Sequence, residues 1–573
     1  MEDNYIQPLL TDYYQISMSY AYWKSGKTSD TAVFDLYFRK NPFKGEYTIF
    51  TGLENCLTLI KKFKYSENDI EYLRKIMPND VDENFFVYLK HLNANDITLI
   101  SLPEGSVVFP KVPLMIVEGP LIICQLLETG LLNLVNFSSL VATNAARFRQ
   151  AAGENKQLLE FGLRRSQGPD GGMSASRNCF LGGFNATSNV LAGKIYNIPI
   201  KGTHAHAYVT SYSKLGELKQ STMKTSDQTT TVDFLDLCKK WHKKVTNILG
   251  VLPDQTNEGE FASFISYALA FPSTFLCLVD TYDVIKSGIP NFISVSLALN
   301  ECGFKAVGVR IDSGDLAYLS HEIRKRFHII STEFNLSWFR SLTIVASNDI
   351  NEDTLHSLNQ QENGTRNGVL QYAALYSGMC NKCIHTGPKN SQIVSFYQGH
   401  SIDSFGIGTH LVTCQKQPAL GCVYKLVEIN GQATIKLSED IDKMTIPGKK
   451  AIYRLFGKDG LALTDYLTCS NEPMPDKNTR LLCRHPSDAS KRAYVNPSLI
   501  EVIHKVYWKD GQQLVEIPSL LEMKDHARRS LLSIRPDHKR ALNPTPYKVS
   551  VSSNLYDFTQ EMWLKSAPIG ELS

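Results

Sequence analysis

Between residues 136 and 420, short apolar runs alternate with stretches whose apolar residues recur at helical spacing. The apolar runs are LLEFGLRR, IPIKGTHAH, TFLCLVD, AVGVRID, LTIVASND and SFGIGT. The helical stretches include SASRNCFLGGFNATSNVLAG, TYDVIKSGIPNFISVSLALNECG, GDLAYLSHEIRKRF and NEDTLHSLNQQ. Alternation of this kind is typical of parallel strands that are joined by crossover helices. The six repeats therefore predict an α/β barrel or a doubly wound sheet.

The regions on either side of this repeat follow other patterns. Near the N-terminus, LLTDYYQISMSYAYWKSG predicts a helix, TAVFDLYFRK a strand, and EGSVVFPKVPLMIVEGP β-structure with prolines at its edges. Toward the C-terminus, Asn-Gly or Asp-Gly pairs at 430–431, 459–460 and 510–511 predict hairpin turns. We therefore expect three domains: an N-terminal α+β domain over 1–135, the α/β barrel over 136–420, and a β-rich C-terminal extension with a helical tail over 421–573.

Polar or glycine-rich residues follow each apolar run of the central region. Parallel strands end on one side of their sheet, and in barrels this side carries the active site. Arginine binds carboxylate or phosphate as a fork, aspartate can hold sugar hydroxyls or Mg²⁺, and the glycine turns QGPDGG, DSGDL and GIGT leave backbone N–H groups for anions. This combination suits a phosphorylated sugar with a divalent metal. The charged candidates are Arg164, Arg165, Arg310, Asp280, Asp312 and Asp315.

Each motif also has a simpler interpretation. GIGT alone is most often a turn, and RIDSGDL alone can be a capped helix start. Tyr14 and Phe161 can be core aromatics. His204 and His206, in GTHAHAY, point to the same side of an extended chain and can serve as metal ligands, as an acid–base pair, as a phosphorylation site or as structural residues. A zinc site would need a third ligand that no sequence neighbour supplies.

Composition narrows these options. The chain has 573 residues, 43% of them apolar and 20% charged, with a net charge of +3, which is typical of a folded protein without bulk attraction to nucleic acid or membranes. We expect no membrane span and no secretory signal, so the 12 cysteines are interpreted as cytosolic thiols. Cys380 and Cys383, with His385 nearby, lack the second ligand pair of a structural zinc site. The segment 362–402 is long for a barrel connection and is either a lid or, as we favour, a surface insertion.

The motifs together resemble one family. They occur in the order and context of nicotinate phosphoribosyltransferase, over about 9–362 and 398–470: LLTDYYQ, EFGLRRSQGPDGGMSAS, NVLAG, GTHAHAY, RIDSGDL, SND, GIGTHLVTC and QPALGCVYKL. The resemblance implies an irregular α/β barrel of the type II phosphoribosyltransferase kind, in a cytosolic homodimer that needs Mg²⁺ or Mn²⁺. It also implies an enzyme that joins nicotinate to 5-phosphoribosyl-1-pyrophosphate (PRPP), giving nicotinate mononucleotide and pyrophosphate. ATP is the co-substrate, and this is the first step of NAD synthesis from nicotinic acid.

The same resemblance implies a role for each matching residue. His206 is the histidine that ATP phosphorylates, and Asp280 and Asp312 hold the ribose hydroxyls or the metal. Tyr14 and Phe161 sandwich the pyridine ring. Arg310, helped by Thr203, meets the nicotinate carboxylate, and Arg164 lies between the ring pocket and the phosphate pocket. The 5′-phosphate cradle comprises Ser347, Asn348, Gly408 and Thr409.

Two departures and two alternatives accompany this assignment. His204 stands where an apolar residue is expected, so either it is a tolerated neighbour or, if protonated, it favours an acid over an amide substrate. The segment 362–402 directly precedes the GIGT motif and leaves loop closure there open. The alternatives are a phosphoribosyltransferase that acts on nicotinamide or quinolinate and an inactive relative that only binds nucleotides. Arg310 argues against nicotinamide, and His206 argues against quinolinate.

Overall fold

The chain divides into two compact units in this computed structural model, which describes residues 5–359, 400–438, 440, 443–477 and 479–567. The first unit comprises 1–146, 177–183 and 414–573, and the second comprises 147–176 and 184–413. The three-domain division expected from the sequence stays a prediction. Segments from both ends of the chain build the first unit together.

An antiparallel sheet of seven strands organises the first unit. The apolar, β-branched and aromatic segment β1 (Thr31–Phe38) forms the predicted strand and pairs with β5 (Met115–Pro120) on one side and β14 (Cys422–Ile429) on the other. C-terminal strands therefore complete both edges of an N-terminal sheet. The predicted turns at 430–431 and 510–511 are confirmed, with positive φ at both residues of each. The full order is β15 (Gln432–Ala433), β14, β1, β5, β3 (Thr98–Ser101), β21 (Lys505–Lys509) and β22 (Gln512–Gln513).

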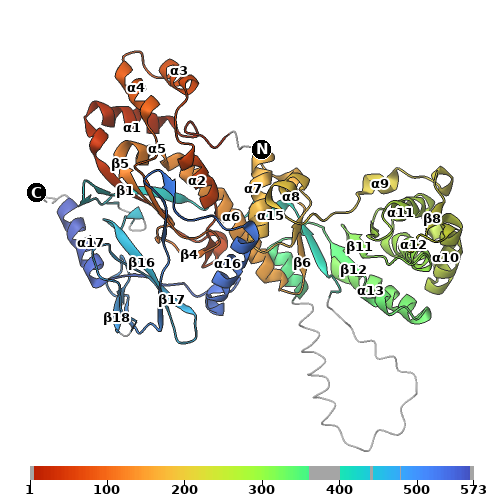
Figure 1. Ribbon diagram of the computed structural model, residues 1–573. Coiled ribbons are helices and arrows are strands. Elements are labelled where there is room, and N and C mark those ends of the chain that lie inside the picture. The colour runs from red at the N-terminus through yellow and green to blue at the C-terminus, as the bar shows by residue number, and fades with distance from the viewer. Residues whose placement is uncertain (1–4, 360–399, 439, 441–442, 478, 568–573) are drawn as a thin grey trace, which may run out of the picture. The chain divides into compact units, whose positions relative to one another are not determined.

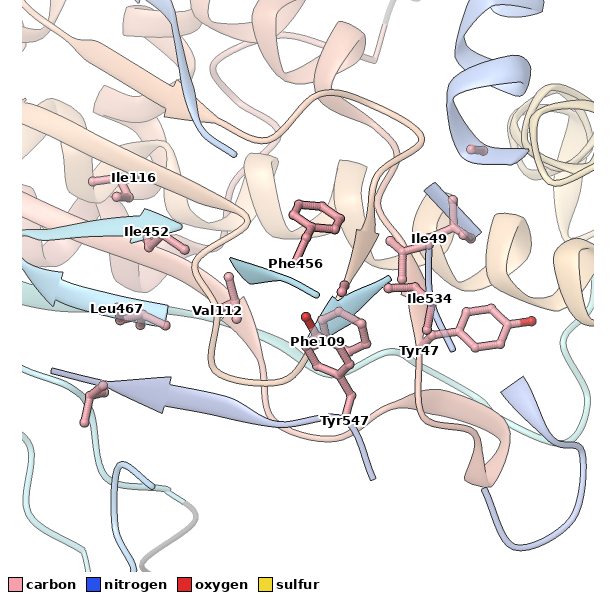
Figure 2. Packing of buried hydrophobic residues seen from close by; sticks show 14 of the residues in the cluster. Tyr47, Ile49, Phe109, Val112, Ile116, Ile452, Phe456, Leu467, Ile534 and Tyr547 are labelled. Atoms are coloured by element: carbon pink, nitrogen blue, oxygen red, sulfur yellow. The ribbon is translucent and has the colours of Figure 1, made fainter. Parts of the chain in front are cut away.

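A second sheet of six strands packs into the core of the same unit. The hairpin of β16 and β17 spans the third predicted turn, with a bulge beside Phe456. Figure 2 shows the buried cluster, in which the rings of Phe109 and Tyr547 stack with their centroids 3.5 Å apart. Burial of this apolar surface is the main stabilising contribution. The order is β19 (Arg492–Val495), β18 (Leu481–Arg484), β23 (Val549–Val551), β17 (Ala462–Cys469), β16 (Lys450–Phe456) and β20 (Leu499–Val502).

Helices cover these sheets. The helix predicted near the N-terminus is confirmed as α1 (Tyr13–Lys24), with Asp12 at its N-cap. One helical stretch, Leu121–Ala152, meets the length and hydropathy expected of a membrane span, which corrects the expectation that no segment would. Its apolar window is 61% buried within the structure, as in the core helix of a globular domain. The remaining helices are α2 (Leu53–Lys61), α3 (Glu67–Ile76), α4 (Glu83–His91), α5 (Leu121–Leu126), α6 (Glu128–Ala152), α16 (Leu520–Leu532) and α17 (Ser553–Ser566), and a short pair of strands, β2 (Thr48–Ile49) and β4 (Val107–Val108), lies beside the sheets.

The second unit holds a six-stranded, wholly parallel sheet, an open half-barrel (Figure 1). Five of the six predicted runs form its strands, and both faces of these short apolar segments are covered, as is usual for parallel sheets. The sixth run, IPIKGTHAH, contributes only an isolated bridge from Ile200 to Thr187. The order is β10 (Leu276–Leu278), β11 (Gly308–Ile311), β12 (Thr343–Ala346), β13 (Ser404–Ile407), β6 (Gln157–Glu160) and β7 (Ala186–Thr187).

One predicted helix is wrong. The stretch 174–193 is split into the end of α7 (Gly168–Leu181), the strand β7 and α8 (Val190–Tyr196). The first helix stops because Gly183, at φ +121°, takes a conformation that favours glycine. Asn189 then caps the second helix by accepting a hydrogen bond from the Ala192 N–H.

Helices α12 and α13 lie beside β11 and β12 in Figure 1, and α10 and α11 pack against α12. The helix predicted after TFLCLVD opens as a π-helix, Val284–Gly288, before α12 (Ile289–Glu301). The helix predicted at 351–361 is present over 352–359. Most of the segment 362–402, including Cys380, Cys383 and His385, lies outside the described residues. The other helices are α9 (His206–Thr210), α10 (Phe234–Leu249), α11 (Glu258–Ala270), α13 (Leu316–Glu333) and α15 (Thr409–Val412), with a β8 (Thr222–Lys224) and β9 (Thr231–Asp233) hairpin.

Candidate functional site

A cavity of about 750 Å³ opens at the carboxyl ends of the parallel strands β6, β11, β12 and β13. This is the sheet end at which the sequence placed the chemistry, and the parallel topology explains why: residues after different strands meet at one edge. The cavity brings together nine of the twelve predicted site residues, namely Phe161, Arg164, Thr203, Arg310, Asp312, Ser347, Asn348, Gly408 and Thr409.

Two aspartates beside the cavity are tied to each other. Asp280 follows β10 and is buried, and its Oδ2 accepts hydrogen bonds from the Asp312 N–H at 2.7 Å and from Ser313 Oγ at 2.6 Å. The carboxylate of Asp312, which follows β11, accepts a hydrogen bond from Ser347 Oγ at 2.7 Å. The second oxygen of Asp280, Oδ1, is buried without a hydrogen-bond partner. This leaves one oxygen of Asp280 available to a ligand.

His206 lies beside this pair rather than among the residues that line the cavity. Its Nδ1 shares a 3.0 Å hydrogen bond with Thr281 Oγ1. Its Nε2 lies 3.9 Å from Asp280 Oδ1 and 3.9 Å from Asp312 Oδ2. Thr281 therefore fixes one ring nitrogen, while the other faces the two carboxylates. The sequence analysis did not identify Thr281, although it directly follows Asp280.

Arg310 is a largely buried cation in the cavity wall. It donates from Nη2 to the carbonyl of His204 at 3.0 Å, and its Nε is buried without a hydrogen-bond partner. Burial lowers the pKa of this guanidinium, against the opposing effect of Asp312 and Asp280, but an arginine remains charged at neutral pH. A buried cation with an unused N–H group is suited to bind an anionic ligand group.

His204 lines the cavity as a neutral side chain. Burial, then the charge of Arg310, lowers its pKa to about 4. Its Nε2 accepts a long hydrogen bond, 3.4 Å, from the Leu278 N–H, and its ring lies edge-on to Tyr267. Burial and the nearby Arg310 therefore disfavour the protonated imidazole on which the charged form of the His204 hypothesis depends.

Phe161 rests directly on the backbone of the neighbouring strand. A Cβ atom at Gly406 of β13 would lie 2.5 Å from Cδ2 of the Phe161 ring, so only glycine leaves room for it. The next residue, Gly162, is equally confined, because a Cβ there would lie 2.4 Å from Val412 Cγ1. The aromatic ring is thus held at the cavity wall by two close backbone approaches.

The loops after β12 and β13 also line the cavity. Asn348 and Asp349 are exposed there, and Asp349 adopts a positive φ of 43°. His410 Nε2 lies 2.9 Å from Asp349 Oδ1, which ties the two loops together. Neither His410 nor Asp349 was identified from the sequence, since a contact between loops leaves no local pattern.

Tyr14 is not among the residues that line the cavity. It belongs to the first unit, on α1, where its side chain is 48% exposed. Its predicted stacking on a pyridine ring stays a prediction.

The site fits a hard divalent cation only in part. Among the described ranges, no group of three or more His, Cys, Asp or Glu side chains is arranged to hold a metal. Mg²⁺, however, is often bound by one or two carboxylates together with substrate phosphates. Asp280, whose Oδ1 has no hydrogen-bond partner, and Asp312 can supply these one or two carboxylates.

Comparison with known proteins agrees with this architecture. Models of the nicotinate phosphoribosyltransferase (NAPRTase) N-terminal domain and C-terminal domain match residues 9–136 and 449–559. The chain is 51% identical to nicotinate phosphoribosyltransferase of Caenorhabditis elegans over 100% of this chain and 96% of that protein, and 52% identical to nicotinate phosphoribosyltransferase 2 of Arabidopsis thaliana over 99% and 96%. The crystal structure of human nicotinic acid phosphoribosyltransferase superposes with a TM-score of 0.82 at 39% identity, covering 96% of this chain and 99% of that one.

Proposed function

Because the chain belongs to the nicotinate phosphoribosyltransferase family, we propose that it transfers the phosphoribosyl group of PRPP to nicotinate, with ATP as co-substrate. The products are nicotinate mononucleotide and pyrophosphate, and the reaction is the first step of NAD synthesis from nicotinic acid. The observation that supports this best is the cavity, which combines a ring-binding aromatic, a buried arginine and a pair of aspartates at one sheet edge.

The nicotinate subsite consists of Phe161 and Arg310. A flat heterocycle stacks favourably on a fixed aromatic ring, and Phe161 is held in place by Gly406. Arg310 has a buried Nε without a partner, which the carboxylate of nicotinate would satisfy. Nicotinamide would instead bring an uncharged amide to this buried cation. We therefore propose an acid as the substrate.

The transfer step depends on the positioning of the two substrates more than on covalent bonds to the enzyme. The lone pair of the pyridine nitrogen forms a bond to C1′ of the ribose, while the bond from C1′ to oxygen breaks and its electrons leave with pyrophosphate. Nicotinate thereby becomes a pyridinium, and no proton is transferred. Asp280 and Asp312 face the positive charge that develops at C1′, and the stabilisation of such charge is a major part of catalysis.

Coupling to ATP is proposed to pass through His206. When Nδ1 donates its proton to Thr281 Oγ1, Nε2 carries the lone pair that attacks the γ-phosphorus of ATP. A bond from nitrogen to phosphorus forms, the bond from phosphorus to the bridging oxygen breaks, and ADP leaves. The phosphohistidine adds a dianion beside Asp280 and Asp312 and so changes what the site binds. Coupling follows if the phosphorylated and free forms differ in their affinities for substrates and products.

A divalent cation belongs to the same proposal. Mg²⁺ or Mn²⁺, when bound, neutralises the charge of the pyrophosphate group. Asp280 and Asp312 are the side chains placed to hold it. The 5′-phosphate is assigned to the loops after β12 and β13, through Ser347, Asn348, Gly408 and Thr409. We further propose a cytosolic homodimer in which Tyr14 contributes to the pyridine subsite.

One assay tests the proposal. Purified protein is incubated with nicotinate and PRPP, with and without ATP, and the mononucleotide, ADP and protein-bound phosphate are measured. Wild-type protein is expected to form the mononucleotide and an acid-labile phosphate. His206→Ala should lose the bound phosphate and ATP coupling, whereas His91→Ala, at an exposed residue of the first unit, should not. Equal use of nicotinamide, or no product at all, would favour the two alternative functions.

A further inference from the structure

The turn that carries Phe161 and Arg164 is held from behind by a buried carboxyl group. Glu160 is the last residue of β6, and successive side chains of a strand point to opposite faces. Phe161 reaches the cavity, and Glu160 is directed away from it and is only 1% exposed. This glutamate is not one of the twelve predicted site residues. It nevertheless stands next to two of them in the chain.

Three donors converge on this carboxyl group. Its Oε1 accepts a short hydrogen bond from the Gly162 N–H, within the turn itself. Its Oε2 accepts from Ser176 Oγ of α7 at 2.8 Å and from Thr187 Oγ1 of β7 at 2.5 Å. Glu160 therefore joins the turn to the next helix and to the neighbouring strand.

Asn189 orients the two hydroxyls. Its backbone N–H donates to Thr187 Oγ1 at 2.9 Å, and its Nδ2 donates to Ser176 Oγ at 3.1 Å. The hydrogen of Thr187 Oγ1 is then directed at Glu160, while that of Ser176 Oγ can go to Glu160 or to the Gly172 carbonyl, 3.0 Å away. The Gly162 N–H can only donate. The arrangement therefore favours an acceptor at both oxygens, which the carboxylate provides.

Burial of the Glu160 carboxylate is unfavourable in free energy. Among the ion pairs of the described residues, none includes Glu160, and a buried charge without a counter-ion is unfavourable even when it is hydrogen-bonded. In return for this unfavourable burial, the carboxylate fixes the position of the turn. The turn is confined between the Glu160 carboxylate and Val412, which a Cβ at Gly162 would strike, while Phe161 lies on Gly406.

We propose that Glu160 is a positioning residue for the nicotinate subsite, which sets the turn that presents Phe161 and Arg164. This inference rests on the proposed function, since it takes nicotinate as the ligand. It assigns no chemistry to Glu160, which does not reach the cavity. Under this proposal, the affinity for the pyridine ring depends on the hydrogen bonds by which Glu160 connects β6 to β7 and α7.

The test is the substitution Glu160→Gln. If the amide directs its NH₂ group at the Gly162 N–H, two donors oppose each other. If it directs the NH₂ group at the two hydroxyls, Ser176 can donate to the Gly172 carbonyl instead, but Thr187 Oγ1 loses its acceptor. We expect the Kd and KM of nicotinate to rise about tenfold or more, with a smaller change in kcat. Phosphorylation by ATP should stay within about twofold, because His206 is held by Thr281 and the aspartates at the other end of the cavity.

Glu260→Gln is the matched control. Glu260 is also fully buried in the second unit, but its Oε2 accepts both hydrogen bonds, from Ser287 and Asn291, and its Oε1 has no partner. An amide can place its NH₂ at the empty position without opposing a donor. Nicotinate affinity should therefore be unchanged. If Glu160→Gln fails to fold, Ser176→Ala removes one donor and should raise the nicotinate Kd severalfold, while the equally buried Ser294→Ala should not.

The outcomes separate the inference from the proposed function. Calorimetry of the wild-type protein with nicotinate comes first, and an absence of binding would overturn the function itself. Given binding, the inference is overturned if Glu160→Gln, or Ser176→Ala in its place, leaves the nicotinate Kd unchanged. It is also overturned if bound phosphate and nicotinate affinity fall in parallel, because that result describes general loss of structure.

Discussion

Two buried cations of the first unit are paired with carboxylates, whereas a largely buried cation at the cavity of the second unit is left partly unpaired. In the first unit, Arg454 makes two hydrogen bonds to Asp465, at 2.7 and 2.9 Å, and Lys450 lies 2.8 Å from Asp35. In the second, Arg310 gives one hydrogen bond to a carbonyl and keeps its Nε without a partner. A buried arginine therefore stabilises the fold in the first unit, whereas in the second unit it keeps an N–H group for a ligand.

The two kinds of sheet explain this difference. In the antiparallel sheets, neighbouring strands run in opposite directions, so a charge on one strand meets its partner directly across, as Arg454 on β16 meets Asp465 on β17. In the parallel sheet, all strands end at one edge and deliver their polar residues to the same cavity. There is little room at that edge to neutralise every charge within the protein.

Breaking the paired arginine should have the largest effect on stability. Arg454→Gln leaves Asp465 buried without its cation, which we expect to cost about 3–5 kcal/mol in the free energy of unfolding. Activity per folded molecule should be unchanged, since neither Arg454 nor Asp465 lines the cavity. Denaturant unfolding and steady-state kinetics measure the two quantities. The double substitution Arg454→Met with Asp465→Leu should recover much of the stability, and a lasting loss of activity in it would contradict the comparison.

Replacing Arg310, the partly unpaired arginine, should lower activity without lowering stability. Arg310→Gln is expected to lower kcat/KM for nicotinate by about 10²-fold, through loss of roughly 3 kcal/mol of charge-assisted hydrogen bonding. Its melting temperature should stay equal to that of the wild type or rise, because a partly unpaired buried cation is removed. Thermal denaturation and kinetics on the same preparation test this. A melting temperature that drops together with the activity would show that Arg310 also stabilises the fold.

A smaller effect is expected at the strand that supports Phe161. Gly406→Ala places a methyl group 2.5 Å from the ring, which must then move. We expect about a tenfold rise in the nicotinate KM, which corresponds to roughly 1.4 kcal/mol, with little change at His206. Gly216→Ala is the control, since a Cβ there meets nothing within 4 Å. Equal KM values for the two variants would mean that the ring does not determine affinity.

The sequence predicts the second unit better than the first for the same topological reason. Five apolar runs become parallel strands, and nine predicted residues meet at one cavity, because each run ends in polar residues that a parallel sheet must bring together. The pairing of β1 with β14, nearly 400 residues apart in the chain, has no local signal. The C-terminal strands were therefore expected to form their own extension.

Within the site, side chains that follow a strand are predictable and those that depend on a distant partner are not. Arg310 and Asp312 were found because they end an apolar run. Glu160 lies inside the run LLEFGLRR, at the end of β6, and its importance depends on Ser176 and Thr187, which reach it through folding alone. The neutral state of His204 likewise depends on burial and on Arg310, neither of which the motif GTHAHAY reveals.

The smallest effect is expected for His204, and it concerns pH. Its pKa of about 4 in the folded state lies below the ordinary 6.5, so the unfolded chain takes up a proton first as the pH falls. The stability that this residue removes should therefore grow as the pH falls from about 6.5 to about 4, stay constant below that range, and be zero above it. Between pH 6 and 8 the ring stays neutral, and the preference for nicotinate over nicotinamide should be constant and unchanged in His204→Leu, because Arg310 is held by the backbone carbonyl. A preference in the wild type that weakens as the pH rises through 6.5, and that is absent from the variant, would restore a charged His204 as the selecting group.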